Sequence, residues 1–379
     1  LVDGEIRVSD IQEVDIIDLL GRDPVPPVPE LLAKNIQDKM VLVTGAGGSI
    51  GSELCRQIVK NKPKALVIYE LTEFALYSID KELRLNSDVT IIPILGSVLD
   101  QAKLERVMEQ YRVQTVYHAA AYKHVPLVEC NPLAGLKNNA IGTAFSLNAA
   151  VKTGVETFVL ISTDKAVRPT NVMGASKRMA ELYCQAMAEA QDQTQISIVR
   201  FGNVLGSSGS VVPLFKQQIA KGGPITVTHP EVTRYFMTIP EASQLVIQAG
   251  ALGQGGDVFL LDMGEPVRIQ DLARQMIALS GLKVRETGSQ EGDIEIQYSG
   301  LRPGEKLYEE LLIDADNTEV TQHSRILRSY EKMYPLDELL LVFERMHDLT
   351  AIQSDIDWAL AQLEHYVDGY QRGKEVKVN

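Results

Sequence analysis

The sequence from residue 40 to residue 51 reads Met40-Val41-Leu42-Val43-Thr44-Gly45-Ala46-Gly47-Gly48-Ser49-Ile50-Gly51. A short apolar run of this kind is typical of a buried β-strand, and the glycine-rich turn leads directly into a helical pattern. Glycines let the backbone turn tightly and approach a ligand, and the N-terminus of the following helix offers unpaired N–H groups to an anion. This order of strand, turn and helix predicts a site for the pyrophosphate of a dinucleotide.

An acidic residue supports the same interpretation. Glu70 ends the next apolar run, roughly 20 residues beyond the turn, where an acid hydrogen-bonds the hydroxyls of the adenosine ribose. An acid there repels the 2′-phosphate of NADP, and no arginine occurs in the ten residues after Glu70. The pattern therefore favours NAD over NADP, although a solvated acid at a strand end would look the same in the sequence.

Composition and charge exclude several classes of protein. The 379 residues are 45% hydrophobic and 23% charged, and the formal charge of −13 opposes non-specific binding to nucleic acid. The longest apolar runs, such as residues 158–163, fall far short of the roughly 20 residues that cross a bilayer. Cys55, Cys130 and Cys184 are too scattered for a disulfide framework or a zinc site. We expect buried free thiols, no bound metal and a cytoplasmic location.

Apolar runs alternate with helical patterns from residue 39 to residue 201. Short continuous apolar strands separated by amphipathic helices predict an α/β fold, a Rossmann-type doubly wound parallel sheet covered on both faces. We expect strands at residues 40–43, 65–69, 89–95, 115–118, 157–161 and 196–201, and helices at residues 74–85, 104–111, 134–153 and 172–190.

The chain is long enough for two unequal domains. Residues 1–38 are expected to form an N-terminal arm or linker, because four prolines between residues 24 and 29 oppose regular helix. Residues 39–202 are expected to form the Rossmann domain, to which later segments return. Weaker alternation predicts a smaller α/β domain for the substrate, mainly over residues 203–330. Helical spacing returns in a C-terminal appendage, residues 331–379.

Four polar residues, Ser162-Thr163-Asp164-Lys165, follow the predicted strand at residues 157–161. Ligands gather at the carboxyl ends of the strands in open α/β sheets, so these side chains are candidates for catalysis. A simple turn or helix cap would carry the same residue types. Lys177 lies one helix further on and is placed to face the same crevice, which favours the catalytic interpretation.

From Lys39 to about Arg328 the sequence resembles the extended short-chain dehydrogenase/reductases. The shared motifs are the glycine turn, His118-Ala119-Ala120-Ala121, Ser162-Thr163 and the lysine at position 177. Within that family the chain is similar to the UDP-N-acetylglucosamine 4,6-dehydratases of bacterial polysaccharide and glycan synthesis. The closer similarity lies in four stretches: His118-Ala119-Ala120-Ala121-Tyr122-Lys123-His124-Val125-Pro126, Ser162-Thr163-Asp164-Lys165-Ala166, Arg200-Phe201-Gly202-Asn203-Val204-Leu205-Gly206 and Leu301-Arg302-Pro303-Gly304-Glu305-Lys306.

One position departs from the superfamily pattern. The usual catalytic base is a tyrosine four residues before the lysine, and that position holds Met173, whose thioether cannot transfer a proton. The resemblance places this methionine in the larger, membrane-attached dehydratases that retain the C5 configuration, whereas the short inverting enzymes keep the tyrosine. It also implies that the arm is a linker from an upstream domain, that Leu1 is a truncation point, and that the full-length protein is attached to the inner membrane.

The resemblance implies a role for each residue of the polar turn. Lys165 would remove the C5 proton, and Asp164 would protonate the departing 6-OH. Thr163 would bind the 4-OH and pass its proton towards Lys177, which would also bind the nicotinamide ribose. Met173 would occupy the tyrosine position without taking part in proton transfer.

The resemblance also implies two sets of binding residues. Contacts with NAD are expected from Thr44, Gly45, Gly47, Gly48, Ser49, Ile50, Gly51, Glu70, Ser97, Val98, Ala119, Ala120, Ala121, Asn139 and Lys177. Contacts with UDP-N-acetylglucosamine are expected from Lys123, His124, Asn203, Val227, Thr228, Arg234, Arg302 and Glu305. Arginine suits this substrate because its planar guanidinium pairs with pyrophosphate oxygens at two points.

Two other functions remain open from the sequence. A non-catalytic dinucleotide-binding regulator would explain the missing tyrosine, but the intact Asp164, Lys165 and Lys177 oppose it. A UDP-sugar 4-epimerase or reductase of the same fold normally keeps the tyrosine and does not need the Asp–Lys pair. The helices at residues 134–153 and 172–190 form a dimer face in many relatives, so we also expect a homodimer or a larger homo-oligomer.

Overall fold

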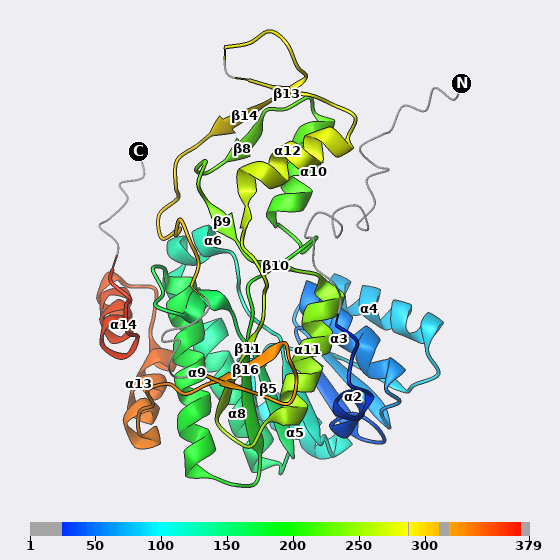
Figure 1. Ribbon diagram of the computed structural model, residues 1–379. Helices are drawn as coiled ribbons and strands as arrows, with labels where there is room; N and C mark the ends of the chain where they lie inside the picture. The colour runs from blue at the N-terminus through cyan, green and yellow to red at the C-terminus, as the bar shows by residue number, and fades with distance from the viewer. Residues whose placement is uncertain (1–24, 287, 311–317, 373–379) are drawn as a thin grey trace. The chain divides into compact units, whose positions relative to one another are not determined.

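The computed structural model describes residues 25–286, 288–310 and 318–372, which group into two units (Figure 1). The larger unit comprises Pro26–Phe201, Pro240–Asp262 and the described residues from Glu310 onward. The smaller unit comprises Gly202–Ile239 and Met263–Glu309. The domain boundaries drawn from the sequence stay a prediction, and the first 24 residues of the expected arm lie outside the described residues.

A nine-stranded sheet forms the centre of the larger unit. Its strand order is β15-β16-β11-β6-β5-β4-β1-β2-β3, in which the strands from β11 to β3 run parallel while β16 and β15 are antiparallel to their neighbours. The predicted doubly wound α/β fold is therefore confirmed. The strands are β1 (Met40–Thr44), β2 (Ala65–Glu70), β3 (Ile91–Leu95), β4 (Thr115–His118), β5 (Thr157–Ile161), β6 (Gln195–Arg200), β11 (Asp257–Leu261), β15 (Thr318–Val320) and β16 (Ile326–Ser329).

The strand order reverses beside β1, because β2 and β4 lie on opposite sides of it. Ligands of open α/β sheets bind outside the carboxyl ends of the strands at such a point. Since β1 ends at Thr44 and β4 ends at His118, the glycine turn and the loop after β4 both leave the sheet there.

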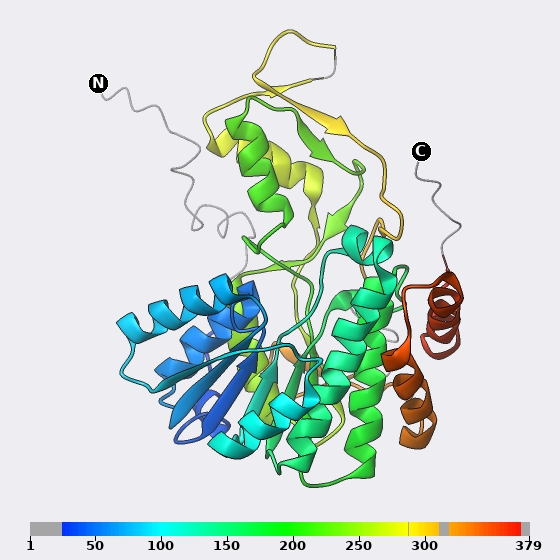
Figure 2. The same ribbon diagram turned by 180° about the vertical axis from the view of Figure 1, so that it is seen from behind.

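Helices cover both faces of this sheet (Figure 2). On one face, helices α5, α8 and α9 share a core with Phe158 and Leu160 of β5. On the other face, α11 packs against β5 so closely that a Cβ at Gly250 would lie 2.6 Å from a methyl group of Val159. The helices of the larger unit up to α11 are α2 (Pro29–Lys34), α3 (Ser49–Lys60), α4 (Glu73–Asn86), α5 (Gln101–Tyr111), α6 (Val125–Cys130), α7 (Pro132–Leu136), α8 (Gly142–Lys152), α9 (Val172–Ala190) and α11 (Ile239–Leu252), with a π-helical turn η2 (Lys137–Ile141) and a 3-10 turn η3 (Asp164–Ala166).

Two C-terminal helices cover α9. Helices α13 (Leu336–Asp348) and α14 (Gln353–Tyr366) both contact it, and the ring of Phe343 lies 4.6 Å from the ring of Tyr183 between centroids. All residues of α9 from Val172 to Ala186 are buried as a result. This helix belongs to the surface that the resemblance assigned to a dimer contact, and the homo-oligomer stays a prediction.

The smaller unit has a core of its own. Helices α10 (Val211–Ala220) and α12 (Ile269–Leu279) pack with a three-stranded sheet around Phe215, Ile225 and Met276. The sheet has the order β13-β14-β8, and two short strand pairs, β7 with β10 and β9 with β12, complete the unit. These strands are β7 (Asn203–Val204), β8 (Ile225–Val227), β9 (Thr233–Arg234), β10 (Phe236–Met237), β12 (Val267–Arg268), β13 (Val284–Arg285) and β14 (Ile294–Tyr298).

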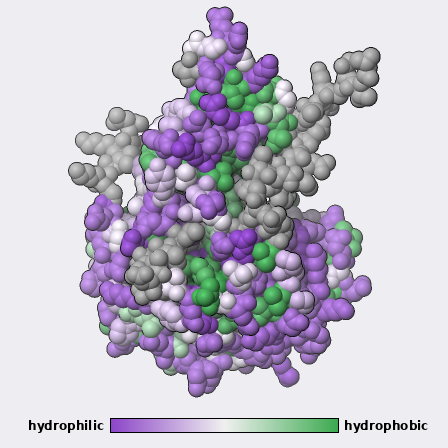
Figure 3. Space-filling model, in the orientation of Figure 1, coloured by the Kyte–Doolittle hydropathy of each residue, from purple (hydrophilic) through white to green (hydrophobic). Residues whose placement is uncertain are grey.

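The surface is mainly hydrophilic on the face of the larger unit that Figure 3 shows. Among the described residues, no helix is long and apolar enough to cross a membrane. Cys55 and Cys184 are buried, and burial raises the pKa of both thiols. The expectation of a buried thiol was wrong for Cys130, which is exposed because it ends the short helix α6, where only Val128 is buried.

Candidate active site

The glycine turn between β1 and α3 is packed so closely that three of its positions exclude a side chain. A Cβ at Gly47 would lie 2.5 Å from the Cβ of Ala75. Gly45 has a φ of +64°, and a Cβ there would lie 2.7 Å from the nitrogen of Ala120. A Cβ at Gly51 would lie 2.0 Å from the oxygen of Gly45. Helix α3 begins at Ser49, and its N-cap, Gly48, places no side chain over the helix end. The residues present therefore fit the pyrophosphate of a dinucleotide.

Glu70 ties the end of β2 to this turn. Its Oε2 accepts a hydrogen bond of 2.9 Å from the backbone N–H of Gly47. Its Oε1 accepts from the backbone N–H groups of Leu71 and Thr72 at 2.9 and 3.0 Å. The position predicted for Glu70, at the strand end beside the glycine turn, is thus observed, and its contact with a ribose stays a prediction.

A buried hydrogen-bond chain joins the carboxyl ends of β1 and β4. His118 Nδ1 lies 2.8 Å from Thr44 Oγ1, and His118 Nε2 lies 3.1 Å from Thr143 Oγ1. The Thr143 hydroxyl donates its proton to the backbone oxygen of Asn139 at 2.7 Å. His118 Nε2 must therefore donate to Thr143, and Nδ1 must accept from Thr44. Burial, and then the charge of Lys177, lowers the pKa of His118 to about 3. His118 is therefore neutral, and it links the carboxyl ends of β1 and β4 rather than carrying a proton.

Asn139 lies on the π-helical turn η2, a type of turn that is frequent at functional sites. Its side-chain amide nitrogen donates to the backbone oxygen of Tyr122 and to Ser176 Oγ, both at 2.9 Å. Its side-chain oxygen accepts from the Tyr122 N–H at 2.7 Å. Because both amide hydrogens are used, Asn139 holds the loop after β4, which contains Ala119–Ala121, against α9. The helix predicted over residues 134–153 is accordingly continuous but contains this wider turn.

Two further residues predicted to contact NAD follow β3. The Ser97 carbonyl accepts from the Tyr69 hydroxyl at 2.9 Å, and Ser97 Oγ accepts from the Leu99 N–H at 3.1 Å. Val98 is buried in the core of the larger unit. Both residues therefore shape the loop at the carboxyl end of β3, and their contact with a cofactor stays a prediction.

The polar turn after β5 brings Thr163, Asp164 and Lys165 into mutual contact. The Thr163 hydroxyl donates to Asp164 Oδ1 at 2.9 Å, and Lys165 Nζ lies 3.0 Å from the same oxygen. Asp164 is only 1% exposed, and its Oδ2 has no hydrogen-bond partner within the described part of the chain. A buried carboxylate oxygen without a partner is costly, so a hydroxyl from a ligand would be stabilised there.

Helix α9 brings Met173 and Lys177 beside this turn. A Cβ at Gly174 would lie 2.1 Å from the Lys165 oxygen, so glycine is needed for the helix to approach the turn this closely. Lys177 Nζ donates to the Ile161 oxygen at 2.8 Å, at the end of β5. Met173 lies one helical turn earlier and is buried. The five residues predicted to be catalytic therefore belong to two adjoining segments.

The buried amine of Lys177 should make stability depend on pH. Burial lowers its pKa from 10.5 to about 8, and the charge of Glu181 opposes part of this shift. Between these values the unfolded chain binds the additional proton, so the free energy of unfolding rises with pH across this window. We expect the free energy of unfolding of wild type, minus that of Lys177→Met, to become more positive by about 3 kcal/mol from pH 8 to pH 10.5, as measured by urea unfolding. A constant difference would contradict the lowered pKa.

Arg234 is the centre of a polar cluster in the smaller unit. Its Nη2 lies 3.1 Å from Glu305 Oε1, and its Nε lies 3.7 Å from Glu309 Oε1. The Thr228 hydroxyl donates to the same Glu305 oxygen at 2.9 Å. The side chain of Arg302 is exposed, and its backbone N–H donates to Glu305 Oε2 at 3.1 Å. Four predicted substrate residues are thus neighbours, although Arg234 is bound to carboxylates in this structure.

The remaining predicted substrate residues lie on separate elements. Asn203 begins β7, and its backbone N–H donates to the Tyr235 oxygen at 3.1 Å. Val227 ends β8 and is buried. Lys123 and His124 lie exposed in the loop before α6 of the larger unit. Their contacts with substrate stay predictions.

Several residues that shape this site had no predicted role. The side chain of Asn171 caps α9 by accepting from the Gly174 N–H at 2.8 Å. Glu181 accepts from Ser162 Oγ at 2.6 Å and so holds the start of the polar turn. An asparagine just before a helical pattern is a known cap signal, so Asn171 could have been identified from the sequence. Glu181 could not, because nothing local in the sequence relates it to Ser162.

Comparisons with known proteins assign the chain to a family. Residues 41–331 match the family model described as "Polysaccharide biosynthesis protein". The capsular polysaccharide biosynthesis protein CapD of Staphylococcus aureus is 49% identical over 346 residues, which are 91% of this chain and 57% of CapD. The probable polysaccharide biosynthesis protein EpsC of Bacillus subtilis is 52% identical over 311 residues, which are 82% of this chain and 51% of EpsC. The chain thus spans about half the length of these relatives.

One solved structure is also similar to this chain. Pen from Bacillus thuringiensis is 30% identical to this chain, with a TM-score of 0.69, and the match covers 83% of this chain and 99% of Pen. The residues that match the family model include the polar turn, α9 and the Arg234 cluster. The chain belongs to the polysaccharide biosynthesis protein family.

Proposed function

We propose that the chain is an NAD-dependent 4,6-dehydratase that converts UDP-N-acetylglucosamine to the UDP-4-keto-6-deoxy sugar and retains the configuration at C5. The observation that carries this proposal is the contact of the buried Asp164 with Lys165, beside a helix that has Met173 where a tyrosine base would stand. An adjacent acid and base suit an elimination of water, whereas hydride transfer alone needs only one proton carrier. Membership of a polysaccharide biosynthesis family supports the same reaction.

The reaction combines the round trip of one hydride with the loss of water. NAD⁺, held by the glycine turn, would supply the redox chemistry by storing one hydride between its loss from C4 and its gain at C6. The ketone at C4 acidifies the C5 proton, which leaves together with the protonated 6-OH. A hydride gained at C6 and a proton returned to C5 would complete the product, so that the sugar loses one water without net oxidation.

The Asp164–Lys165 pair can reach the protonation states that the elimination needs. The elimination needs a carboxylic acid at Asp164 and a neutral amine at Lys165, whereas the ion pair consists of a carboxylate and an ammonium. One proton moving along the 3.0 Å contact from Lys165 Nζ to Asp164 Oδ1 gives a carboxylic acid and a neutral amine without changing the total charge. A substrate that excludes water favours this neutral form. Asp164 then protonates the 6-OH, and Lys165 removes the C5 proton and returns it to the same face.

Lys177 is the group that we propose as acceptor of the 4-OH proton, through the hydroxyl of Thr163. A pKa of about 8 leaves part of the amine neutral near pH 7, as a proton acceptor requires. The same side chain would bind the nicotinamide ribose, and Met173 would only fill the space beside it.

The cofactor and the nucleotide are assigned to separate groups of residues. We propose NAD rather than NADP because the carboxylate of Glu70 stands beside the glycine turn and would repel a 2′-phosphate. We propose that Arg234 and Arg302 bind the diphosphate of the substrate, with Asn203 and Glu305 on its nucleotide part. Arg234 would then exchange its present carboxylate partners for phosphate oxygens. The other predicted contacts, Val227, Thr228, Lys123 and His124, belong to the same proposal.

For the whole protein we propose a role in bacterial surface-glycan synthesis, such as O-antigen or capsule. The resemblance also favours a homo-oligomer, located in the cytoplasm and held at the inner membrane by a segment outside this chain. A UDP-sugar 4-epimerase, a reductase and a non-catalytic regulator are the alternatives that the experiment must separate.

The experiment is incubation with UDP-N-acetylglucosamine in deuterated water, followed by NMR of the sugar. We expect a 4-keto-6-deoxy product with deuterium at C5, since Lys165 exchanges its proton with solvent. A C4 epimer would indicate an epimerase, and consumption of substrate only with added reduced cofactor would indicate a reductase. An unchanged substrate would indicate a regulator.

Restoring the tyrosine should bring little gain. Met173→Tyr is expected to leave kcat for dehydration within about threefold of wild type, because the proton transfers are assigned to Asp164, Lys165 and Lys177. Steady-state kinetics with UDP-N-acetylglucosamine test this. A gain of tenfold or more would show that the site is still built around a tyrosine base.

A further inference from the structure

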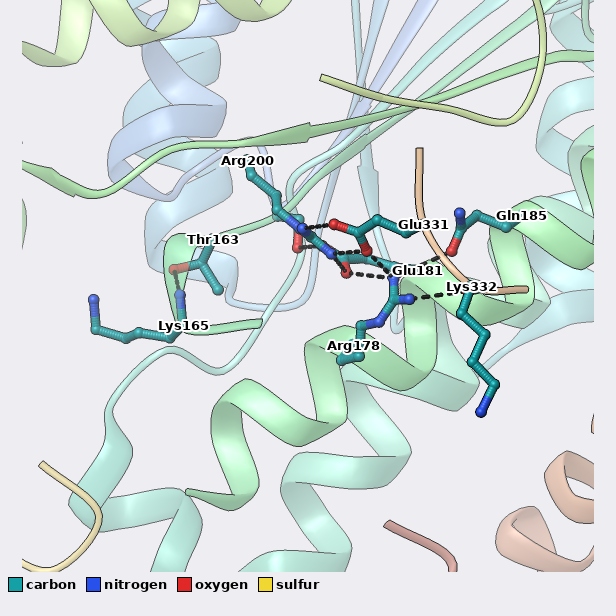
Figure 4. A network of polar contacts seen from close by, with 9 residues as sticks. Thr163, Lys165, Arg178, Glu181, Gln185, Arg200, Glu331 and Lys332 are labelled. Atoms are coloured by element: carbon teal, nitrogen blue, oxygen red, sulfur yellow. Dashed lines mark hydrogen bonds and ion pairs between the residues drawn. The ribbon is translucent and has the colours of Figure 1, made fainter. Parts of the chain in front are cut away.

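Four charged side chains form a closed network in the interior of the larger unit (Figure 4). Arg200, at the end of β6, donates to Glu181 Oε1 and Oε2 at 2.8 and 2.6 Å and also binds Glu331. Arg178 lies 2.9 Å from Glu331 Oε2 and 3.3 Å from Glu181 Oε2. All four side chains are at most 7% exposed.

The network balances its charges, with two arginines and two glutamates. Removing one partner from a buried group of this kind leaves a charge without compensation, whereas removing one of each sign keeps the balance. Arg178 and Glu181 belong to α9, while Glu331 lies on the segment that leads into α13. The network therefore joins the C-terminal helices to the centre of the sheet.

The same network reaches the polar turn. Glu181 Oε1 accepts from Ser162 Oγ at 2.6 Å as well as from Arg200, and Ser162 directly precedes Thr163. The residue after Arg200, Phe201, accepts from the backbone N–H of Asp164 at 3.0 Å. In Figure 4 the side chain of Lys165 points away from the four charged groups, so it is not a member of the network. The turn is thus held from two sides, by α9 and by the end of β6.

We propose that Glu331 is a positioning residue for catalysis: it orients Arg178 and Arg200, these hold Glu181, and Glu181 fixes the turn that contains Asp164 and Lys165. The inference rests on the proposed dehydratase function for its catalytic consequence and on the structure alone for the ordering of the turn. By this inference, the C-terminal segment contributes to the ordering of the active site. This segment begins at residue 331, where the family match ends.

A role in folding alone and a role in positioning predict different kinetics. If Glu331 only stabilised the fold, a folded variant well below its unfolding temperature would have an unchanged kcat. If it positions the turn, kcat falls while KM changes little, because the substrate's nucleotide part is bound by other residues. Mobility of the turn can be measured independently of any substrate, by hydrogen exchange of the peptide that covers residues 160–168.

The experiment compares wild type with Glu331→Gln, Glu331→Asp and the charge-balanced double variant Arg178→Gln/Glu331→Gln. For Glu331→Gln we expect kcat to fall about 30-fold with KM within about threefold, and exchange in the turn to quicken about tenfold. The double variant should recover kcat to within about fivefold of wild type. Asp257→Asn is the matched control, since Asp257, the first residue of β11, forms a largely buried ion pair of 2.8 Å with Arg328.

The outcomes of this experiment decide whether Glu331 positions the turn. Glu331→Gln with the kcat and turn exchange of the control would overturn the proposal. If that variant does not fold, Glu331→Asp carries the test, because it keeps the charge but shortens the reach, and an unchanged kcat and exchange would again overturn it. If wild type does not dehydrate UDP-N-acetylglucosamine, the proposed function fails, and hydrogen exchange in the turn still decides whether Glu331 positions it.

Discussion

Asp164→Asn is expected to lower kcat for dehydration by about 10³-fold while the protein keeps its NAD. The amide cannot protonate the departing 6-OH, and it cannot take the proton of Lys165 across the 3.0 Å contact. Lys165→Met should have an effect of similar size, because it removes the base at C5. Product formation followed by NMR and cofactor content after denaturation are the two measurements.

A matched carboxylate serves as control for this prediction. Asp100 accepts from the Lys103 N–H as the N-cap of α5, and Asp100→Asn keeps a capping side chain. This variant should retain wild-type kinetics. Substantial residual turnover in Asp164→Asn or Lys165→Met, with NAD bound, would refute the acid and base assignments.

Gly51→Ala is expected to weaken NAD binding at least about 100-fold. The added Cβ would lie 2.0 Å from the Gly45 oxygen, so the turn would have to open at the point where we propose that helix α3 approaches the pyrophosphate. Titration of the folded variant with NAD, followed by calorimetry, measures the loss.

Gly154→Ala is the control for the glycine substitution. Gly154 has a φ of +74° and nothing lies within 4 Å of a Cβ there, so the change costs only the left-handed strain, about 1–2 kcal/mol. Its NAD affinity should equal that of wild type. A folded Gly51→Ala protein with wild-type affinity would show that the turn does not cradle the cofactor.

The sheet and its helices could be predicted because their signals are local. All residues of β1 and β2 are buried, so both strands appear in the sequence as continuous apolar runs. The glycines at positions 45 and 51 stand out for a similar reason, since their close backbone contacts allow no side chain. The carboxyl end of β5 could be recognised because polar residues directly follow an apolar strand.

The contacts that hold the site could not be predicted in the same way. Glu181 binds Ser162 and Arg200, each 19 residues away along the chain, and Glu331 binds Arg200 across 131 residues. Such pairs leave no periodic pattern, and a charged residue in a helix normally indicates a solvated face. The wider turn at Asn139 and the coverage of α9 by α13 and α14 likewise depend on packing between distant segments.

The most direct test of the central claim uses UDP-N-acetylglucosamine that carries deuterium at C4. A hydride taken from C4 and returned within the same site predicts a product with that deuterium at C6 and no net change in the cofactor. Deuterium that remains at C4, returns to C4 in an epimer, or leaves with a reduced cofactor would contradict the account.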